Sequence, residues 1–593
     1  MKILLVTPPL TQLNTSYPAT CQLVGFLKTH NIDTGQMDLS IELVNALFTK
    51  EKLNEVFDAI NPATKLSKQV KIIIQQREFY TNTIESVMRY LGGNDSSLAI
   101  RFSNVDFWPL TKRTPTDDDL EWAFGLIGNH DRATHICTLF LRDICDLIKE
   151  CIDPHFELIR YAESLCLRLP EFEPLHQELQ KELSLIDRLM IDLFERKFNY
   201  SKPEFVGFTV PFPGNLYAAL RCAQWLKTHH PDVKICMGGG YINTELRQIA
   251  ETRLFDYIDY LTFDDGELPL LQLLKNEELI RTIYRDSNNE LVKVNFNSHK
   301  NIAFKDLGTP TYKGLVRNNC INLIELTNPM HAPWSNGRWN KLTLAHGCYW
   351  AGCSFCDCNL DYINRYETAA IQLIVDRMEA MIEETGVTGF HLVDEAAPPI
   401  VLKQLAEEII RRKLIVSYWG NVRFEKAFTP ELCYLMAQSG CIAISGGLEV
   451  ASDRILKLIN KGITIDTASE SMKNFTQAGI MTHAYLMYGF PTETAKETIE
   501  SLEVVRSLFE KGWLQSAFWH RYAMTMHSPS GMKPESVGAK YIPTPLGTFA
   551  NNEIPFTTTN EIDLDFYAKG LNLATYNFMQ GVGYEMPVKE WFK

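Results

Sequence analysis

The chain has 593 residues, 45% of them hydrophobic and 22% charged, with a net charge of −14. This composition is typical of a soluble globular protein of two to four domains. The acidic balance disfavours a nucleic-acid partner, because phosphate binding requires an excess of Lys and Arg. The opening "MKILLVTPPL" has too short an apolar run for a signal peptide, and no run of about 18 apolar residues predicts a membrane span.

The first part of the chain alternates strand and helix signals around a long helical stretch. Residues 1–40 read as strand, helix and strand, and the same alternation resumes at "EFVGFTVPF". It continues through the strand "VKICMGGGY", a predicted helix at "TELRQIAETRLF" and "YLTFDDGELPLLQLL". From about 41 to 200 the apolar residues recur at helical spacing with almost no strand signal. We therefore predict a doubly wound parallel α/β domain over 1–290, with a helical insertion at about 41–200.

A second strand–helix series begins after an irregular segment. Residues 280–340 are rich in Asn and Pro and are predicted to be irregular, with 291–340 as a connecting segment. Six predicted strands then alternate with amphipathic helices over 341–523, which is typical of a partial (β/α)6 barrel. Residues 524–593 form a C-terminal segment with no clear repeat.

Four of the fourteen cysteines lie within eleven residues, directly after the first predicted barrel strand. Cys348, Cys353 and Cys356 have the spacing C-x4-C-x2-C. They could close a zinc site with Cys358 or His346 as the fourth ligand. Alternatively, three thiolates could hold an iron–sulfur cluster with one open iron. A third reading, unrelated thiols, fits this density poorly. The position at the end of a barrel strand favours the cluster, because chemistry in such barrels lies there.

The stretch "GCYWAGCSFCDCNLDYINRY" resembles the cluster loop of radical S-adenosylmethionine enzymes, especially those with an N-terminal cobalamin-binding domain. The usual spacing in that family is C-x3-C-x2-C, so one extra residue is a departure. The resemblance continues in order through "FHLVDEAAP", "WGNVRFEKAF", "SGGLEVASDRILKLINKGIT" and "AYLMYGFPTET". It implies a 4Fe–4S cluster on Cys348, Cys353 and Cys356, with Cys358 outside the ligand set. It also implies an S-adenosylmethionine site formed by Phe355, Asp394, Glu395, Arg423, Glu449 and Gly489.

The resemblance also covers strand ends of the first domain and implies bound cobalamin. The residues it places there are Pro9, Tyr17, Pro211, Gly238, Gly239, Gly240, Gly266 and Glu267. The D-x-H-x-x-G motif, which supplies a histidine below cobalt in other cobalamin proteins, is absent. The alternative is a vestigial domain that only packs on the barrel. If both cofactors act on one substrate, the carboxyl edge of the first sheet must face the barrel mouth.

The resemblance implies a radical enzyme that generates a 5′-deoxyadenosyl radical and methylates an unactivated carbon of a small molecule or peptide. Two alternatives remain open: a cobalamin-free radical enzyme catalysing epimerisation or ring formation, and a non-catalytic zinc-binding protein. The expected partners are the substrate and an electron donor such as flavodoxin or ferredoxin, with no nucleic acid and no membrane. The scattered cysteines and missing export signal favour a reducing, cytoplasmic location.

Overall fold

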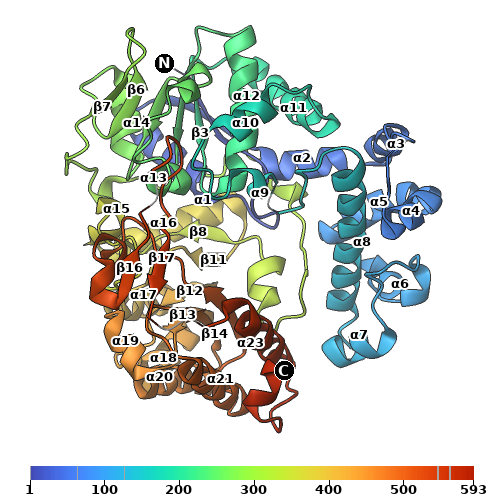
Figure 1. The fold of residues 1–593 in the computed structure, drawn as a ribbon, viewed down its shortest axis with the longest axis vertical. Coiled ribbons are helices and arrows are strands. Elements are labelled where there is room, and N and C mark those ends of the chain that lie inside the picture. Colours follow the sequence, from blue (N-terminus) through green and yellow to red (C-terminus); the bar gives the residue numbers. More distant parts are fainter. Residues whose placement is uncertain (1, 63, 126, 160, 544–545, 560–561) are drawn as a thin grey trace.

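The computed structural model describes residues 2–62, 64–125, 127–159, 161–543, 546–559 and 562–593. An α/β domain lies above a second α/β unit in the view of Figure 1, and most of the helical insertion stands to one side of both. No helix in the described ranges combines the length and apolar character needed to cross a membrane.

The first domain is built on one seven-stranded sheet with the order β2-β1-β3-β4-β5-β6-β7. The first five of these strands run parallel, and β6 and β7 are added antiparallel at one edge. Its strands are β1 (Lys2–Thr7), β2 (Asp33–Asp38), β3 (Phe205–Thr209), β4 (Lys234–Gly238), β5 (Tyr260–Thr262), β6 (Thr282–Arg285) and β7 (Leu291–Val294). Its main helices are α1 (Pro18–Thr29), α12 (Pro213–His229) and α14 (Glu267–Lys275).

The predicted helical insertion is confirmed as an interruption of this sheet. The insertion connects β2 to β3, which lie on either side of β1 in the sheet, and within the described residues it contains ten α-helices. They are α2 (Leu39–Leu47), α3 (Lys50–Asp58), α4 (Lys68–Gln75), α5 (Arg77–Leu91), α6 (Ala99–Phe102), α7 (Asp117–Phe124), α8 (Asn129–Cys151), α9 (Glu163–Cys166), α10 (Glu173–Leu179) and α11 (Leu185–Ser201). Their buried side chains, such as Tyr80 and Ile144, belong to the same hydrophobic core as Leu4 and Val6 of β1.

Two local predictions were wrong. Residues 280–294 are not irregular, because β6 and β7 form a hairpin that extends the sheet. The segment "TELRQIAETRLF" was predicted as a helix, but only α13 (Gly240–Thr244) and a 3-10 turn at Thr252–Asp256 form there. Its apolar residues, including Leu246, Ile249 and Leu254, are instead buried in the domain core.

The second unit is the predicted partial barrel, with six parallel strands in the order β15-β14-β13-β12-β11-β8. The strands are β8 (Asn340–Leu342), β11 (Gly389–Leu392), β12 (Ser417–Val422), β13 (Cys441–Glu449), β14 (Met481–Tyr488) and β15 (Ser516–Arg521). The connecting helices include α16 (Ile371–Thr385), α17 (Pro399–Arg412), α18 (Pro430–Gln438), α20 (Ile465–Gln477) and α21 (Ala495–Glu510). Side chains from these helices and strands share one hydrophobic core.

The C-terminal segment completes the barrel wall. A hairpin of β16 (Ala539–Tyr541) and β17 (Phe556–Thr558) is followed by α23 (Leu564–Met579). Helix α23 lies beside β15, where the Trp519 indole N–H donates to the Thr575 hydroxyl at 2.8 Å. The last strand of the open barrel is therefore covered from outside.

Candidate active site

The cysteine-rich loop leaves β8 at the carboxyl edge of the barrel and is fixed by backbone contacts. Gly347 has a φ of +69°, and a Cβ there would lie 2.1 Å from the carbonyl oxygen of Arg365. Only glycine therefore fits this turn. The Cys348 N–H donates to the Ile363 carbonyl at 2.9 Å, and the Ser354 N–H donates to the Ile459 carbonyl at 2.9 Å. The loop is thus tied to the segment that follows it and to a loop of the barrel.

The cysteines in this loop differ in their surroundings. Cys353 is buried, while Cys348 and Cys356 are half-buried. A hydrogen bond between the Cys353 and Cys356 thiols lowers the pKa of Cys353 and raises that of Cys356. Cys358 is also buried, and its thiol donates to the Cys353 carbonyl at 3.5 Å. Cys358 is therefore already engaged by the loop's own backbone.

The loop does not have the geometry of a closed single-ion site. Within the part of the chain that the structure describes, no three His, Cys, Asp or Glu side chains converge as ligands of one metal ion do. Thiolates on one zinc ion all lie about 2.3 Å from it. The described residues therefore contain no preformed site of this kind in the loop.

Charged side chains from two barrel loops surround Cys353. The Lys461 ammonium forms a 2.6 Å ion pair with Glu449, and both side chains are almost completely buried. Arg423 donates to the Lys461 carbonyl at 2.6 Å, and its guanidinium lies 4.2 Å from the centre of the Trp350 ring. Lys461 and Arg423 both act electrostatically on Cys353. The predicted Arg423 and Glu449 are thus brought together beside the cysteine loop, and Lys461 joins them.

Lys461 was not predicted as a site residue, although the quoted "NKGIT" contains it. Its ammonium also lies 5.5 Å from the centre of the Phe355 ring, so it contacts a second predicted residue. Glu449, its partner, has a φ of +60° at the end of β13. This left-handed backbone at a non-glycine residue is a strained conformation held by its surroundings.

Asp394 and Glu395 follow β11 but lie in different environments. Asp394 is buried, and its carboxylate accepts from the N–H groups of Leu344 and Ala345 at 2.8–3.1 Å. Burial nonetheless raises its pKa to about 7. Glu395 is exposed, and its carboxylate acts electrostatically on Tyr17 of the first domain. Desolvation by the neighbouring protein raises the pKa of Glu395. Asp394 therefore fixes the start of the cysteine loop, while Glu395 has its carboxylate open to a ligand.

The turn after β14 is also organised by a buried carboxylate. Gly489 has a φ of +79°, and its N–H donates to Glu493 at 2.8 Å. The Phe490 N–H donates to the same oxygen at 3.1 Å, and Thr498 donates to the other at 2.8 Å. A side chain at Gly489 would collide with Leu564 of α23. Gly489, a residue of the predicted S-adenosylmethionine site, thus also suits a turn that needs a positive φ.

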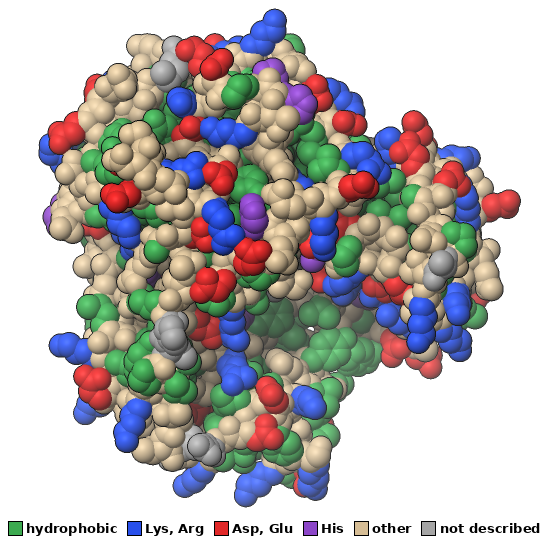
Figure 2. Space-filling model, turned by 45° about the horizontal axis from the view of Figure 1, so that its top comes forward, with side chains coloured by type: hydrophobic (Ala, Val, Ile, Leu, Met, Phe, Trp, Pro, Cys, Tyr) green, Lys and Arg blue, Asp and Glu red, His purple; other side chains and the backbone are tan. Residues whose placement is uncertain are grey.

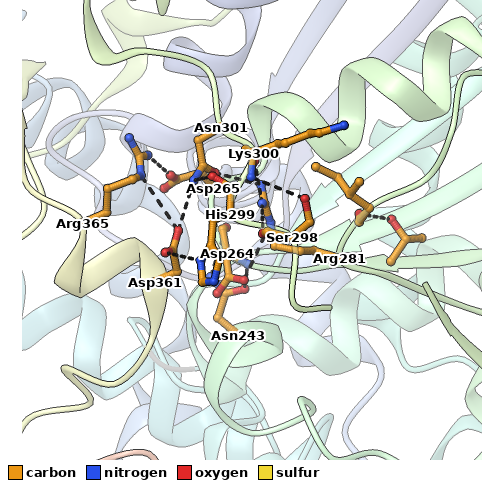
Figure 3. Close-up of polar contacts among 12 residues, drawn as sticks. Asn243, Asp264, Asp265, Arg281, Ser298, His299, Lys300, Asn301, Asp361 and Arg365 are labelled. Atoms are coloured by element: carbon orange, nitrogen blue, oxygen red, sulfur yellow. Dashed lines mark hydrogen bonds and ion pairs between the residues drawn. The ribbon is translucent and has the colours of Figure 1, made fainter. Parts of the chain in front are cut away.

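The first domain meets the cysteine loop at the carboxyl end of β5. His346 and Asp265 are hydrogen-bonded at 2.8 Å, and Arg365 forms an ion pair with the same carboxylate. Figure 3 shows how this contact continues: Arg365 lies near Asp361, whose carboxylate accepts from Asn301 at 3.1 Å. The carboxyl edge of the first sheet therefore faces the barrel's cysteine loop, as the two-cofactor hypothesis requires.

A buried arginine supports this junction from the first domain. Arg281 donates to the carbonyl oxygens of Ser298 and Lys300 at 2.9 and 2.7 Å and to Asn301 at 2.9 Å (Figure 3). Its guanidinium lies 3.7 Å from Asp264. Gly266 and Glu267 of "DDGE" are the predicted cobalamin residues, but Asp265 before them makes the contact with the barrel, and Asp264 pairs with Arg247 and Arg281 of the first domain. No local pattern in the sequence identifies their distant partners.

A cavity of about 240 Å³ lies at the carboxyl edge of the first sheet. Four of the predicted cobalamin residues line it, together with Gly207, Thr262 and Asp264: they are Gly238, Gly239, Gly266 and Glu267. A Cβ at Gly207 would lie only 2.8 Å from the Leu5 side chain, so glycine avoids a steric clash in this wall of the cavity. Burial raises the pKa of Glu267 to about 7.

The other four predicted cobalamin residues do not line this cavity: Pro9, Tyr17, Pro211 and Gly240. Tyr17 lies where the two units approach each other. Its ring packs edge-on against Phe212 at 6.0 Å, and burial, with the nearby Glu395 carboxylate, raises its pKa to about 12. Gly240 begins α13, and a Cβ there would lie 2.9 Å from the Pro211 carbonyl.

Comparisons with known proteins show relatives and a solved structure to which this chain is similar. The chain is 27% identical over 337 residues to the anaerobic magnesium-protoporphyrin IX monomethyl ester cyclase of Rubrivivax gelatinosus, which covers 55% of this chain and 59% of the cyclase. It is 24% identical to an uncharacterized methyltransferase of Pyrococcus horikoshii, over 56% of this chain and 70% of that protein. The match to the cyclase thus spans less than two thirds of that relative's length.

The fold is shared with a solved methyltransferase structure. TsrM from Kitasatospora setae, with tryptophan substrate and a SAM analogue bound, matches 97% of this chain and 89% of its own with a TM-score of 0.53 and 13% identity. The Radical SAM superfamily model matches residues 342–505, from the end of β8 into α21. Residues 342–505 of this chain are therefore a radical SAM domain, preceded by an α/β domain as in TsrM.

Proposed function

We propose that this protein is a cobalamin-dependent radical SAM enzyme that methylates an unactivated carbon of a small molecule or peptide. The observation that carries the proposal is the contact of Asp265 with His346 and Arg365. It joins the carboxyl edge of the first sheet to the loop with Cys348, Cys353 and Cys356. Ligands at those two edges could then share one water-poor space, which radical chemistry requires.

Cys348, Cys353 and Cys356 would hold the 4Fe–4S cluster, and Glu395, Arg423 and Glu449 would bind S-adenosylmethionine. When bound, these cofactors supply a 5′-deoxyadenosyl radical. Arg423 offers a planar donor suited to a carboxylate, and the open Glu395 offers an acceptor suited to an amino group. The role proposed for Asp394 is positioning, because its oxygens are already used by the Leu344 and Ala345 amides.

The glycine-lined cavity of the first domain supports cobalamin as the second cofactor. The strand ends carry no side chain at Gly238, Gly239 and Gly266, so a bulky ligand could approach the backbone there. Methyltransferase names among the relatives and TsrM support methyl transfer. The cyclase relative supports ring formation by a radical enzyme as the second candidate. An electron donor such as flavodoxin or ferredoxin and a cytoplasmic location belong to the same proposal.

Anaerobic reconstitution with iron, sulfide and cobalamin tests this proposal. We expect about four iron atoms and one cobalamin per chain, and release of 5′-deoxyadenosine from S-adenosylmethionine under reduction. Cys353→Ala should lose iron, while Cys441→Ala, a buried cysteine of β13, should keep it. A protein that binds zinc in place of iron, or a Cys353→Ala variant with full iron content, would refute the cluster assignment.

A further inference from the structure

The interior of the barrel contains a lysine without an acidic partner. Lys341 of β8 is only 5% exposed. Its ammonium donates to the imidazole Nδ1 of His391 at 2.7 Å and to the Gln12 amide oxygen at 3.4 Å. No carboxylate among the described residues forms an ion pair with it, and burial alone lowers its pKa to about 7. Buried cations in proteins are normally paired, so this one lacks its counter-charge.

The histidine that accepts from Lys341 is held in its neutral form. The His391 ring stacks on Trp419 of β12 with centroids 3.6 Å apart and an angle of 8° between the planes. Burial and the nearby Lys341 lower the pKa of His391 to about 2. His391 therefore contributes an acceptor for the ammonium but no negative charge, and the charge of Lys341 remains uncompensated.

Two further polar atoms in the barrel interior have no partner among the described residues. One is the Nε1–H of Trp419, a side chain that is 7% exposed, which finds no acceptor in that part of the chain. The other is Nε2 of His483 on β14, a fully buried side chain that contacts Ser516 through Nδ1 at 2.9 Å. Unsatisfied buried polar atoms are rare in native proteins and are commonly satisfied by a ligand or water. A ligand with oxygen acceptors would suit both the indole N–H and the ammonium.

A cavity of about 440 Å³ is lined by two side chains that contact these groups. They are Gln12, the amide that contacts Lys341, and Trp334, whose ring lies edge-on to His483 at 4.9 Å. The other walls are apolar at Leu13, Ile159, Ile321, Leu323, Ile324, Leu326 and Phe518 and polar at Asn14, Glu325, Asn328, His331 and Ser335. Figure 2 shows a hollow between the barrel and the helical insertion, with hydrophobic side chains on its walls.

We propose that the substrate is a carboxylate with an apolar body, and that Lys341 binds its carboxylate inside the barrel. The apolar body would lie along the cavity between the barrel and residues 321–326, where hydrophobic burial stabilises it. Gln12 and His391 position the ammonium, and Trp419 offers a second donor. This inference rests on the proposed function, because it names the class of substrate on which that enzyme would act.

Binding of two probes that differ only in charge tests the inference without any turnover. Octanoate and octanamide share an apolar chain, but only octanoate carries a negative charge. Calorimetric titration of the reconstituted wild-type protein should show octanoate binding at least about tenfold more tightly than octanamide. Lys341→Met keeps the length of the side chain and removes its charge, and this preference should then disappear. Lys403→Met, on the exposed face of α17, should retain it.

Equal binding of the two probes to the wild type would overturn the inference, and this comparison requires no variant to fold. Persistence of the preference in Lys341→Met would also overturn it. The proposed function fails separately, if iron and 5′-deoxyadenosine are missing while the octanoate preference is intact.

Discussion

Replacing Asp265 by Asn should loosen the cysteine loop from the first domain. The carboxylate is hydrogen-bonded to His346 and paired with Arg365, and these three side chains are 14–17% exposed. Removing one partner of a buried ion pair costs roughly 3–5 kcal/mol. Here Arg365 keeps a 2.6 Å ion pair with Glu367, and Asn still offers an oxygen acceptor. We therefore expect a loss of about 2 kcal/mol, below that range.

Hydrogen exchange read by mass spectrometry measures this loss where it occurs. About 2 kcal/mol corresponds to roughly 30-fold faster exchange of amides that are released by local opening. The increase should appear in peptides covering residues 343–368. Asp256→Asn is the matched control, because it breaks a more exposed pair with Arg285 in the same domain. A change below about threefold in the cysteine loop, or an equal change in the control, would refute the reasoning.

Three further predictions concern single positions. Cys358→Ala should retain wild-type iron content after reconstitution, because its thiol is bonded to the Cys353 carbonyl; iron loss equal to that of Cys353→Ala would contradict the three-ligand assignment. Gly347→Ala should abolish iron binding, since its Cβ would overlap the Arg365 carbonyl; retained iron would show that the turn can rearrange. Burial raises the pKa of Glu42 to about 7, so ionisation of this side chain destabilises the folded protein as the pH rises. The melting temperature of Glu42→Gln should therefore exceed that of the wild type by an amount that grows from pH 5 to pH 8. A constant difference across this range would contradict the reasoning.

The sequence predicted those parts of the fold that depend on local periodicity. Buried parallel strands such as β3, and amphipathic helices such as α8, carry their own pattern of apolar residues. The segment around Leu246 and Ile249 misled the same reasoning, because residues buried by tertiary contacts can mimic helical spacing. The hairpin of β6 and β7 was missed because its partly exposed strands, only four residues long, give a weak signal.

The candidate site was predicted where a residue belongs to a recognisable segment. Cys348, Cys353 and Cys356 lie in one loop. Arg423 and Glu449 lie at the carboxyl ends of two successive strands, so order along the chain places them together. Asp265 and Lys341 depend instead on contacts across many residues: Asp265 meets His346, and Lys341 meets Gln12. Such pairings are set by the packing of the two units and leave no local pattern.

Polar side chains at the barrel mouth and interior fall into two groups by whether the protein already satisfies them. Asp394 and Glu493 each accept from two backbone N–H groups and so hold loops in place. Among the described residues, neither Glu395, which is exposed, nor Lys341, which is buried, forms an ion pair. An uncompensated buried charge such as that of Lys341 is costly, and a ligand of opposite charge would remove this cost. Glu395 and Lys341 are therefore available to a ligand, whereas Asp394 and Glu493 position loops; the proposed contacts Arg423 and Glu449 already have protein partners that a ligand would have to share.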